Sequence, residues 1–209
     1  MKTFIPFALL FCLANLTVYA QNAEDKAYKN SIGLDIQSIF GDGAGTEIQY
    51  ERYLGGLFAR AAIGFSARKS EDSDLSGSFS ASSSDEILLR AGLGHRFTFD
   101  KFRFQLGSDL SLIKVHSETT RSVPPAPSGP LGIEQFNNTN ITRAGIQPFI
   151  GMGYQISKRF SIRAEAYSSV AHFKQQEASA NNGNAASLTQ EGWNTSFFSS
   201  FRFFARVHF

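Results

Sequence analysis

The last stretch of the chain, residues 193–209, alternates between two kinds of side chain. Counted back from the C-terminus, every second position is apolar or small: Phe209, Val207, Ala205, Phe203 and Phe201. The positions between them include Arg202 and Arg206. A period of two residues is typical of a β-strand, so this pattern predicts a strand with one apolar face and one arginine-bearing face. An edge strand of a soluble sandwich is the alternative for this stretch taken alone.

Seven earlier segments alternate in the same way: residues 29–40, 46–54, 57–68, 87–99, 102–116, 141–156 and 160–173. Tight turns follow the second, fourth and sixth segments, at residues 55–56, 100–101 and 157–159. Polar loops follow the others, near residues 41–45, 69–86, 117–140 and 174–192, and only the first of these is short. An even strand number with short turns on one rim and long loops on the other is typical of a transmembrane barrel. We therefore predict an all-β fold, an eight-stranded antiparallel transmembrane up-and-down β-barrel of residues 29–209.

Two places interrupt the alternation. Pro148 lies inside the sixth predicted strand and cannot donate a ladder hydrogen bond. The phase also slips at residues 113–115 of the fifth predicted strand. We expect a β-bulge at each place.

Alternation by itself does not say which face points outward, because a soluble lipocalin-like barrel would turn its apolar face inward. The composition of the charged face favours a membrane barrel, since all its cations are arginines and none is a lysine. Arginine suits confined ion pairs because its planar guanidinium binds carboxylates in a bidentate manner. An eight-stranded barrel is just wide enough for side chains to fill. We therefore predict a plugged, polar lumen that contains the following charge network: Asp35, Glu47, Glu51, Arg60, Arg68, Arg90, Arg96, Arg103, Asp109, Arg143, Arg163, Glu165, Arg202 and Arg206.

The whole chain after residue 20 resembles the small eight-stranded OmpA/OmpX-type outer-membrane proteins of bacteria. The resemblance lies in the strand architecture and in a C-terminal strand that ends in Phe, and it includes no catalytic motif. It implies insertion into outer-membrane lipid and recognition of the last strand by the barrel-assembly machinery. The residues that match this assembly signal are Phe201, Phe203, Val207 and Phe209.

The N-terminus has the features of an export signal. Residues 1–20 have Lys2, an apolar run and small residues before a cleavage point after Ala20, which is typical of a secretory signal peptide. Residues 21–28 then form a short periplasmic lead. Cys12 is the only cysteine and lies within the signal, so the mature chain has no thiol chemistry; a lipoprotein cleaved before Cys12 is the alternative. The formal net charge of +2 is too small to imply a nucleic-acid partner.

The lumen charges allow two functional interpretations. In the first, the ion pairs are structural and the protein acts through its long outer loops, as a surface-interaction protein with an unknown ligand. In the second, the barrel is a narrow pore for small solutes. Nine arginines against five carboxylates in the predicted network would make such a pore favour anions.

Enzymatic and metal chemistry find little support in the sequence. His116, Ser117 and Glu118 suggest the residue types of a lipid A-modifying enzyme, but adjacent strand residues point to opposite faces, so His116 and Ser117 cannot form a dyad. The acidic residues of segment 69–86 lack the spacing of a calcium loop. We expect no catalytic residue, metal or cofactor. Tyr53, Tyr167 and His208 are assigned to the two membrane interfaces, as parts of aromatic girdles.

Overall fold

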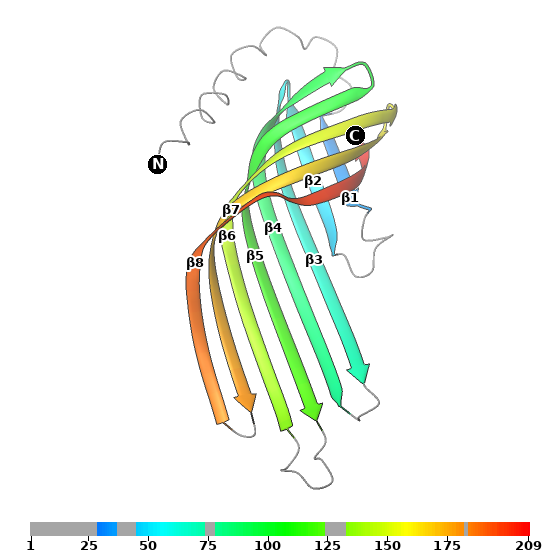
Figure 1. The fold of residues 1–209 in the computed structure, drawn as a ribbon. Helices are drawn as coiled ribbons and strands as arrows, with labels where there is room; N and C mark the ends of the chain where they lie inside the picture. Colours follow the sequence, from blue (N-terminus) through cyan, green and yellow to red (C-terminus); the bar gives the residue numbers. More distant parts are fainter. Residues whose placement is uncertain (1–28, 37–44, 74–77, 124–132, 182–183) are drawn as a thin grey trace.

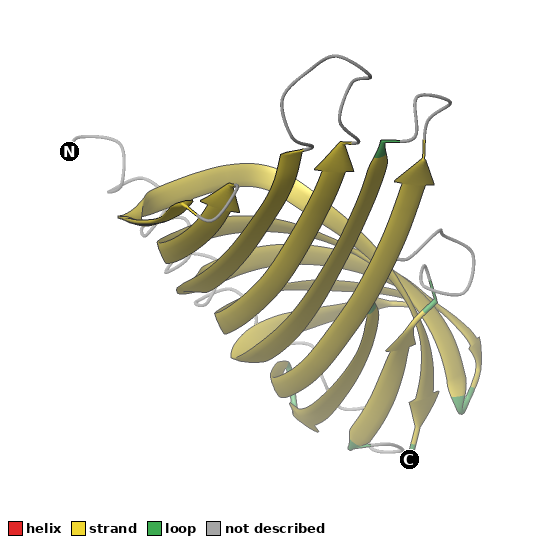
Figure 2. Ribbon diagram, turned by 90° about the horizontal axis from the view of Figure 1, so that it is seen from below, coloured by secondary structure: helices red, strands yellow, loops and turns green. Residues whose placement is uncertain are grey.

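The computed structural model describes residues 29–36, 45–73, 78–123, 133–181 and 184–209, and every regular element in them is a strand (Figures 1 and 2). Eight strands follow one another along the chain. Their bounds are β1 Asn30–Asp35, β2 Thr46–Leu54, β3 Leu57–Ser73, β4 Phe79–Phe99, β5 Phe102–Val123, β6 Ile133–Ser157, β7 Phe160–Asn181 and β8 Asn184–His208.

Each strand pairs antiparallel with its chain neighbour, and β8 pairs with β1 to close the barrel. Backbone hydrogen bonds between Asn30 and Phe209, of 3.1 and 3.0 Å, complete the closure at the chain's end. The three tight turns lie where alternation predicts them, and Gly55 supplies a positive φ of 75° in the first. The predicted eight-stranded antiparallel barrel is therefore confirmed.

The predicted loops are largely wrong, because most of their residues belong to strands. Strands β3 and β4 extend into segment 69–86, β5 and β6 into 117–140, and β7 and β8 into 174–192. These polar residues still form regular ladders, as the 2.8 Å hydrogen bond between the Ser70 and Ser82 hydroxyls illustrates. The polar composition marks strands with two hydrated faces. Residues 41–44 of the first predicted loop, the signal peptide 1–20 and the lead 21–28 lie outside the described residues.

Neither predicted bulge forms. The β4–β5 register is continuous through residues 113–115, and β5–β6 pairing continues through Ser108 and Pro148. On the other side of β6, pairing with β7 skips residues 147–148 and resumes in the same register. Two irregularities lie elsewhere: the β6–β7 register shifts between Gln155 and Ser157, and residues 197–199 of β8 oppose Ser168 of β7, where Phe198 has a φ of 47°. The Phe198 amide donates to the Ser168 hydroxyl at 3.2 Å, so a side chain replaces the missing ladder contact.

The barrel is inverted relative to a soluble protein, since its charged residues are buried and its large apolar residues are exposed. The exposed apolar side chains cover the outer surface of every strand and include Leu34, Ile48, Ile63, Leu93, Leu110, Ile146, Ile150, Met152 and Phe203. On β5 they run from Phe102 to Leu112, about ten residues, which corresponds to ~25 Å across a membrane at a strand tilt of ~40°. This apolar belt fits the hydrocarbon thickness that outer-membrane barrels present. No helix in the described part of the chain has the length and hydropathy to cross a membrane.

Strands β3 to β8 continue beyond the belt on one side, while β1 and β2 stop near it (Figure 1). The outward face changes character there, from Leu112 on β5 to Lys114, and from Val170 on β7 to His172 and Lys174. We call this six-stranded continuation the sheet extension. The closed part of the barrel lies on the side of the tight turns, and the sheet extension lies on the opposite side of the apolar belt.

Candidate functional site

The first ion-pair cluster in the lumen is centred on Arg60 of β3. Its guanidinium donates to both carboxylate oxygens of Asp109, at 2.7 and 2.5 Å, and to Glu165 at 3.0 Å. All three side chains are almost completely inaccessible to solvent. The three residues come from β3, β5 and β7, so these contacts cross the interior of the barrel and fill its middle.

A second cluster continues the network toward the tight-turn rim. Arg163 lies 2.6 Å from both Glu51 and Glu165, and Arg206 lies 2.9 Å from Glu51. Two buried glutamines, Gln49 and Gln105, also accept hydrogen bonds from Arg163. Each buried charge therefore has oppositely charged or polar partners, which offsets the cost of removing it from water.

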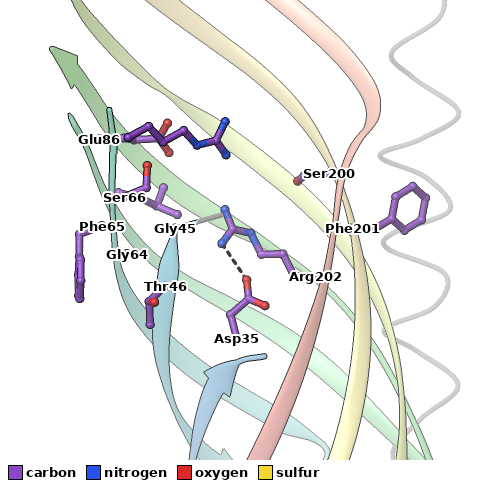
Figure 3. A pocket seen from close by; sticks show the side chains of 12 residues that line it. Asp35, Gly45, Thr46, Gly64, Phe65, Ser66, Glu86, Ser200, Phe201 and Arg202 are labelled. Carbon is purple, nitrogen blue, oxygen red and sulfur yellow. Dashed lines mark hydrogen bonds and ion pairs between the residues drawn. The ribbon is translucent and has the colours of Figure 1, made fainter. Parts of the chain in front are cut away.

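A third cluster lies at the opposite end of the plug. Arg90 pairs with Glu47, which also accepts an ion pair of 2.9 Å from Arg202. Arg202 reaches Asp35 at 3.3 Å and is the partly exposed member, with 23% of its side-chain surface accessible. Figure 3 shows Arg202 of β8 and Asp35 of β1 facing each other in a pocket that also includes Thr46, Ser66 and Glu86. This pocket of about 220 Å³ lies at the outer end of the charge network.

Aromatic rings occupy the space between the ion pairs. Phe58, Phe149 and Tyr167 are almost fully buried, and the centroids of successive rings in this row are 6.1 and 6.0 Å apart. The Arg60 guanidinium lies 3.3 Å from the Phe149 ring centroid, and that of Arg90 lies 4.3 Å from Tyr167. Cation–π contacts of this kind strengthen when they are removed from water. The lumen is thus closed by interleaved guanidinium groups and rings.

Glycines make room for these rings in the facing strands. A methyl group at Gly94 would lie 2.5 Å from Phe58 Cζ, and one at Gly107 would lie 2.6 Å from Phe149 Cζ. Contacts this short do not occur between real side chains, so both positions require glycine while the rings keep these positions.

The structure brings together ten of the fourteen charged residues predicted for the lumen. The buried ten are Asp35, Glu47, Glu51, Arg60, Arg90, Arg96, Asp109, Arg163, Glu165 and Arg206. They comprise five arginines and five carboxylates, so the excess of cations on which an anion-favouring pore depended is absent from the buried set. Arg202 is partly buried, as described, and so is Arg103, 3.4 Å from the His208 ring.

Arg68 and Arg143 are exposed, contrary to the prediction that they lie within the plugged lumen. Arg68 pairs in register with Ser84, beyond the end of β2, and Arg143 pairs with Phe173 in the sheet extension. Both residues keep the inward phase of their strands. At their level the strands in the described part of the chain no longer close the barrel, and both side chains are exposed.

Three assignments to the membrane interface are also wrong. Tyr53 and Tyr167 are 6% and 1% exposed, and both side chains point into the plug. His208 is 3% exposed and lies 2.8 Å from the Ser161 hydroxyl. Their strand phase gave the correct signal, because each has the same phase as the charged residues of its own strand. The four residues of the predicted assembly signal are all exposed on the outer surface, as their phase requires: Phe201, Phe203, Val207 and Phe209.

The polar residues around His116 form a separate cluster on the outward face of the sheet extension. The His116 ring lies 2.8 Å from the Asn140 side-chain oxygen and 3.2 Å from Glu118. Because both oxygens favour the protonated ring, the hydrogen bond to Asn140, together with that to Glu118, raises the pKa of His116 above its ordinary value. Ser117 occupies the intervening strand position. Within the described residues, no group of three or more His, Cys, Asp or Glu side chains could hold a metal ion.

Comparison with known proteins gives structural similarities only. No protein-family model matches the chain, and no curated protein matches it. The chain is similar to the crystal structure of CarO from Acinetobacter baumannii, with 13% identity and a TM-score of 0.38 over 87% of this chain and 97% of that one. It is also similar to a major outer membrane protein from Thermus thermophilus, with 14% identity and a TM-score of 0.39 over 88% and 100% of the two chains. The candidate site is therefore interpreted from its own geometry.

Proposed function

We propose that this chain is an outer-membrane β-barrel with a sealed lumen, which acts as a rigid scaffold for a surface-interaction site on its sheet extension. Export by the signal peptide 1–20, insertion into outer-membrane lipid and recognition of β8 by the barrel-assembly machinery are parts of this proposal. No enzymatic step is assigned to it.

The observation that carries the proposal is the closure of the lumen by a network whose ten buried charged residues are five arginines and five carboxylates. Arg60, Asp109 and Glu165 meet across the barrel with almost no accessible surface, and aromatic rings fill the gaps between such pairs. An ion that passed through would have to separate several of these contacts. A solute pore needs sites that bind weakly enough for the solute to leave.

The first test is the single-channel conductance of the refolded mature protein in a planar bilayer, beside a variant with Arg90, Arg96 and Arg163 changed to Ala. A shift of the unheated band on a gel shows that each protein has folded. We expect no discrete openings from the native barrel. If the native protein shows anion-favouring openings and their conductance changes in the variant, the lumen is a pore and the sealed-barrel proposal fails.

The second test addresses the surface role. Deletion of residues 176–189 removes matched lengths of β7 and β8, because Gln176 pairs with Thr189. The shortened chain should keep the gel shift, since its belt and plug are intact. We expect cells that display it to lose the adhesion or partner binding that the full-length protein confers. Equal adhesion by both proteins would remove this hairpin from the proposed surface-interaction site.

A further inference from the structure

We propose that the outward face at the junction of the belt and the sheet extension binds the phosphate-bearing headgroup of an outer-leaflet lipid. Lys114, Thr142 and Lys174 hold the headgroup, and the outward face of β7 directly below them contacts an acyl chain. This inference rests on the outer-membrane location proposed above, and it names a lipid ligand for a surface that the sealed lumen does not involve.

The register of the strands places the three polar residues in one row. Lys114 of β5 pairs with Thr142 of β6, and Thr142 pairs with Lys174 of β7. All three are exposed on the outward face. Neighbouring strands are ~4.8 Å apart, so the two lysine backbones lie ~10 Å apart with the threonine hydroxyl between them. Two flexible ammonium groups and one hydroxyl can therefore converge on a single phosphate group.

The row lies at the depth of a lipid headgroup. The row directly below it contains Leu112 of β5, Ala144 of β6 and His172 of β7, and it ends at Trp193 of β8. Trp193 is 74% exposed, and its ring makes an edge-on contact with His172 at a centroid distance of 5.4 Å. An exposed tryptophan at the upper limit of an apolar belt is typical of the membrane–water interface. Lysines directly above that level meet the phosphates of the lipid.

A groove on the lipid-facing surface lies below this row. It spans β4 to β8, and its lining includes the small side chains Ala164 and Ala166 of β7 and the larger side chains Phe97, Phe104, Leu106, Ile150, Met152 and Phe201. The groove has a volume of about 470 Å³ and an almost entirely apolar lining. Between Ala166 and the lysine row, the outward residues of β7 include the small side chains of Ser168 and Val170. Ala166 lies eight residues below Lys174, which is ~20 Å across the membrane at a strand tilt of ~40°, so the groove belongs to the half of the belt nearer the tight turns. The acyl chain of a lipid whose phosphate binds at Lys174 contacts Val170 and Ser168 above the groove.

Nearby acidic groups weaken the attraction of the two lysines for a phosphate but do not abolish it. Lys174 lies 3.3 Å from Glu191, and both side chains are about half exposed, at 50% and 51%. An exposed pair of this kind is weak, and the ammonium group keeps further donors for a phosphate. Glu118 contacts His116, and Asp85 of β4 pairs in register with His116, so both carboxylates lie in the part of the face above Lys114. The two lysines therefore remain the cations nearest the belt on these strands.

The test measures lipid retention by native mass spectrometry of the refolded mature protein in detergent, with diphosphoryl lipid A as the probe. Lys114→Gln combined with Lys174→Gln should reduce retention roughly tenfold to thirtyfold, the scale expected for two basic residues at a lipid surface. Lys101→Gln combined with Lys158→Gln is the matched control, because it removes the same charge from the tight-turn rim. This control should retain lipid like the native protein.

Further arms separate the two halves of the site and the source of the phosphate. A lipid A without phosphates should bind weakly to the native protein, and the Lys114/Lys174 variant and the Lys101/Lys158 control should bind it as weakly as the native protein does. If millimolar inorganic phosphate stabilised the native barrel against unfolding as well as the lipid does, the ligand would be a soluble phosphate and the lipid proposal would fail.

Equal lipid retention by the native protein and the Lys114/Lys174 variant would overturn the proposal. Each protein must show the gel shift. If the double variant does not fold, the single variants Lys114→Gln and Lys174→Gln should each show a several-fold lower lipid retention. Unchanged retention in both single variants would overturn the proposal as well. Conductance of the same samples keeps the two proposals apart. If the barrel does not conduct and its lipid retention does not depend on phosphate, only the lipid-site proposal fails. If the barrel conducts and its lipid retention does depend on phosphate, only the sealed-lumen proposal fails.

Discussion

Replacement of Arg60 by Met tests whether the plug is dry. Met is uncharged and fills the space of the aliphatic part of the arginine side chain, so the change removes mainly the guanidinium group. Asp109 would lose both of its short hydrogen bonds and keep only Arg90, at 3.5 Å. Glu165 would keep its 2.6 Å contact with Arg163. The variant therefore leaves one almost unpaired carboxylate in the centre of the barrel.

The structure sets the expected magnitude. Loss of one partner from a buried ion pair costs about 3–5 kcal/mol, because the remaining charge stays buried without compensation. The Arg60 and Asp109 side chains are only 1% and 0% accessible, so solvent screening does not reduce this figure. The half-exposed pair of Lys174 and Glu191 is the matched comparison, and its loss in Lys174→Gln should cost at most about 1 kcal/mol.

The assay is equilibrium unfolding by urea in phosphatidylcholine vesicles, followed by the fluorescence of Trp193, the single tryptophan of the chain. Addition of Asp109→Leu to Arg60→Met should restore much of the lost stability, because it removes the unpaired carboxylate. If Arg60→Met cost no more than Lys174→Gln, the lumen would be hydrated and screened. That result would refute the dry plug and favour the pore.

Three further predictions concern other parts of the barrel. Gly92→Ala should abolish the gel shift, because its methyl group would overlap Asp109 and the Ser108 carbonyl, whereas Gly153→Ala, whose nearest neighbour is 3.1 Å away, should still fold. The NMR titration of His116 should have its midpoint above the ordinary histidine pKa, and the midpoint should move down in Asn140→Ala. The stability that protonated His116 contributes to the fold is fully present below the ordinary pKa and is lost as the pH rises through the raised pKa. Phe209→Ala should lower outer-membrane insertion in cells yet refold in detergent, because the hydrogen bonds of its backbone with β1 remain; refolding and insertion that fail together would assign Phe209 to barrel closure alone.

Periodicity in the sequence determined the barrel within the apolar belt. The predicted bounds of β2 are those observed, the three tight turns are in place, and the outward phase of β8 is correct. In this region each strand has one face toward lipid and one toward the packed lumen. Lipid requires apolar side chains and the packed lumen holds polar and charged ones, so hydropathy alternates along each strand and the strands can be predicted from the sequence.

Only the tertiary structure decided where the strands end. In the sheet extension both faces are hydrated, so residues 69–73 and 79–86 carry no alternation although they are paired in register. Polar composition is compatible with a loop or with a two-sided hydrated strand, and pairing with the neighbouring strand selects the second. The same unequal strand lengths expose Arg68 and Arg143, whose phase alone placed them in the lumen.

The bulge and the plug also depend on contacts that the sequence does not order. Pro148 removes a backbone hydrogen-bond donor from β6, but the β7–β8 bulge lies at Phe198 of β8. There the hydroxyl of Ser168 accepts a hydrogen bond from the Phe198 amide. Period-two patterning put Arg60 and Glu165 on the inner face, yet it did not show that they pair across the barrel. Strand phase is a local property of the chain, whereas the identity of a partner across the lumen follows from the register of the closed barrel.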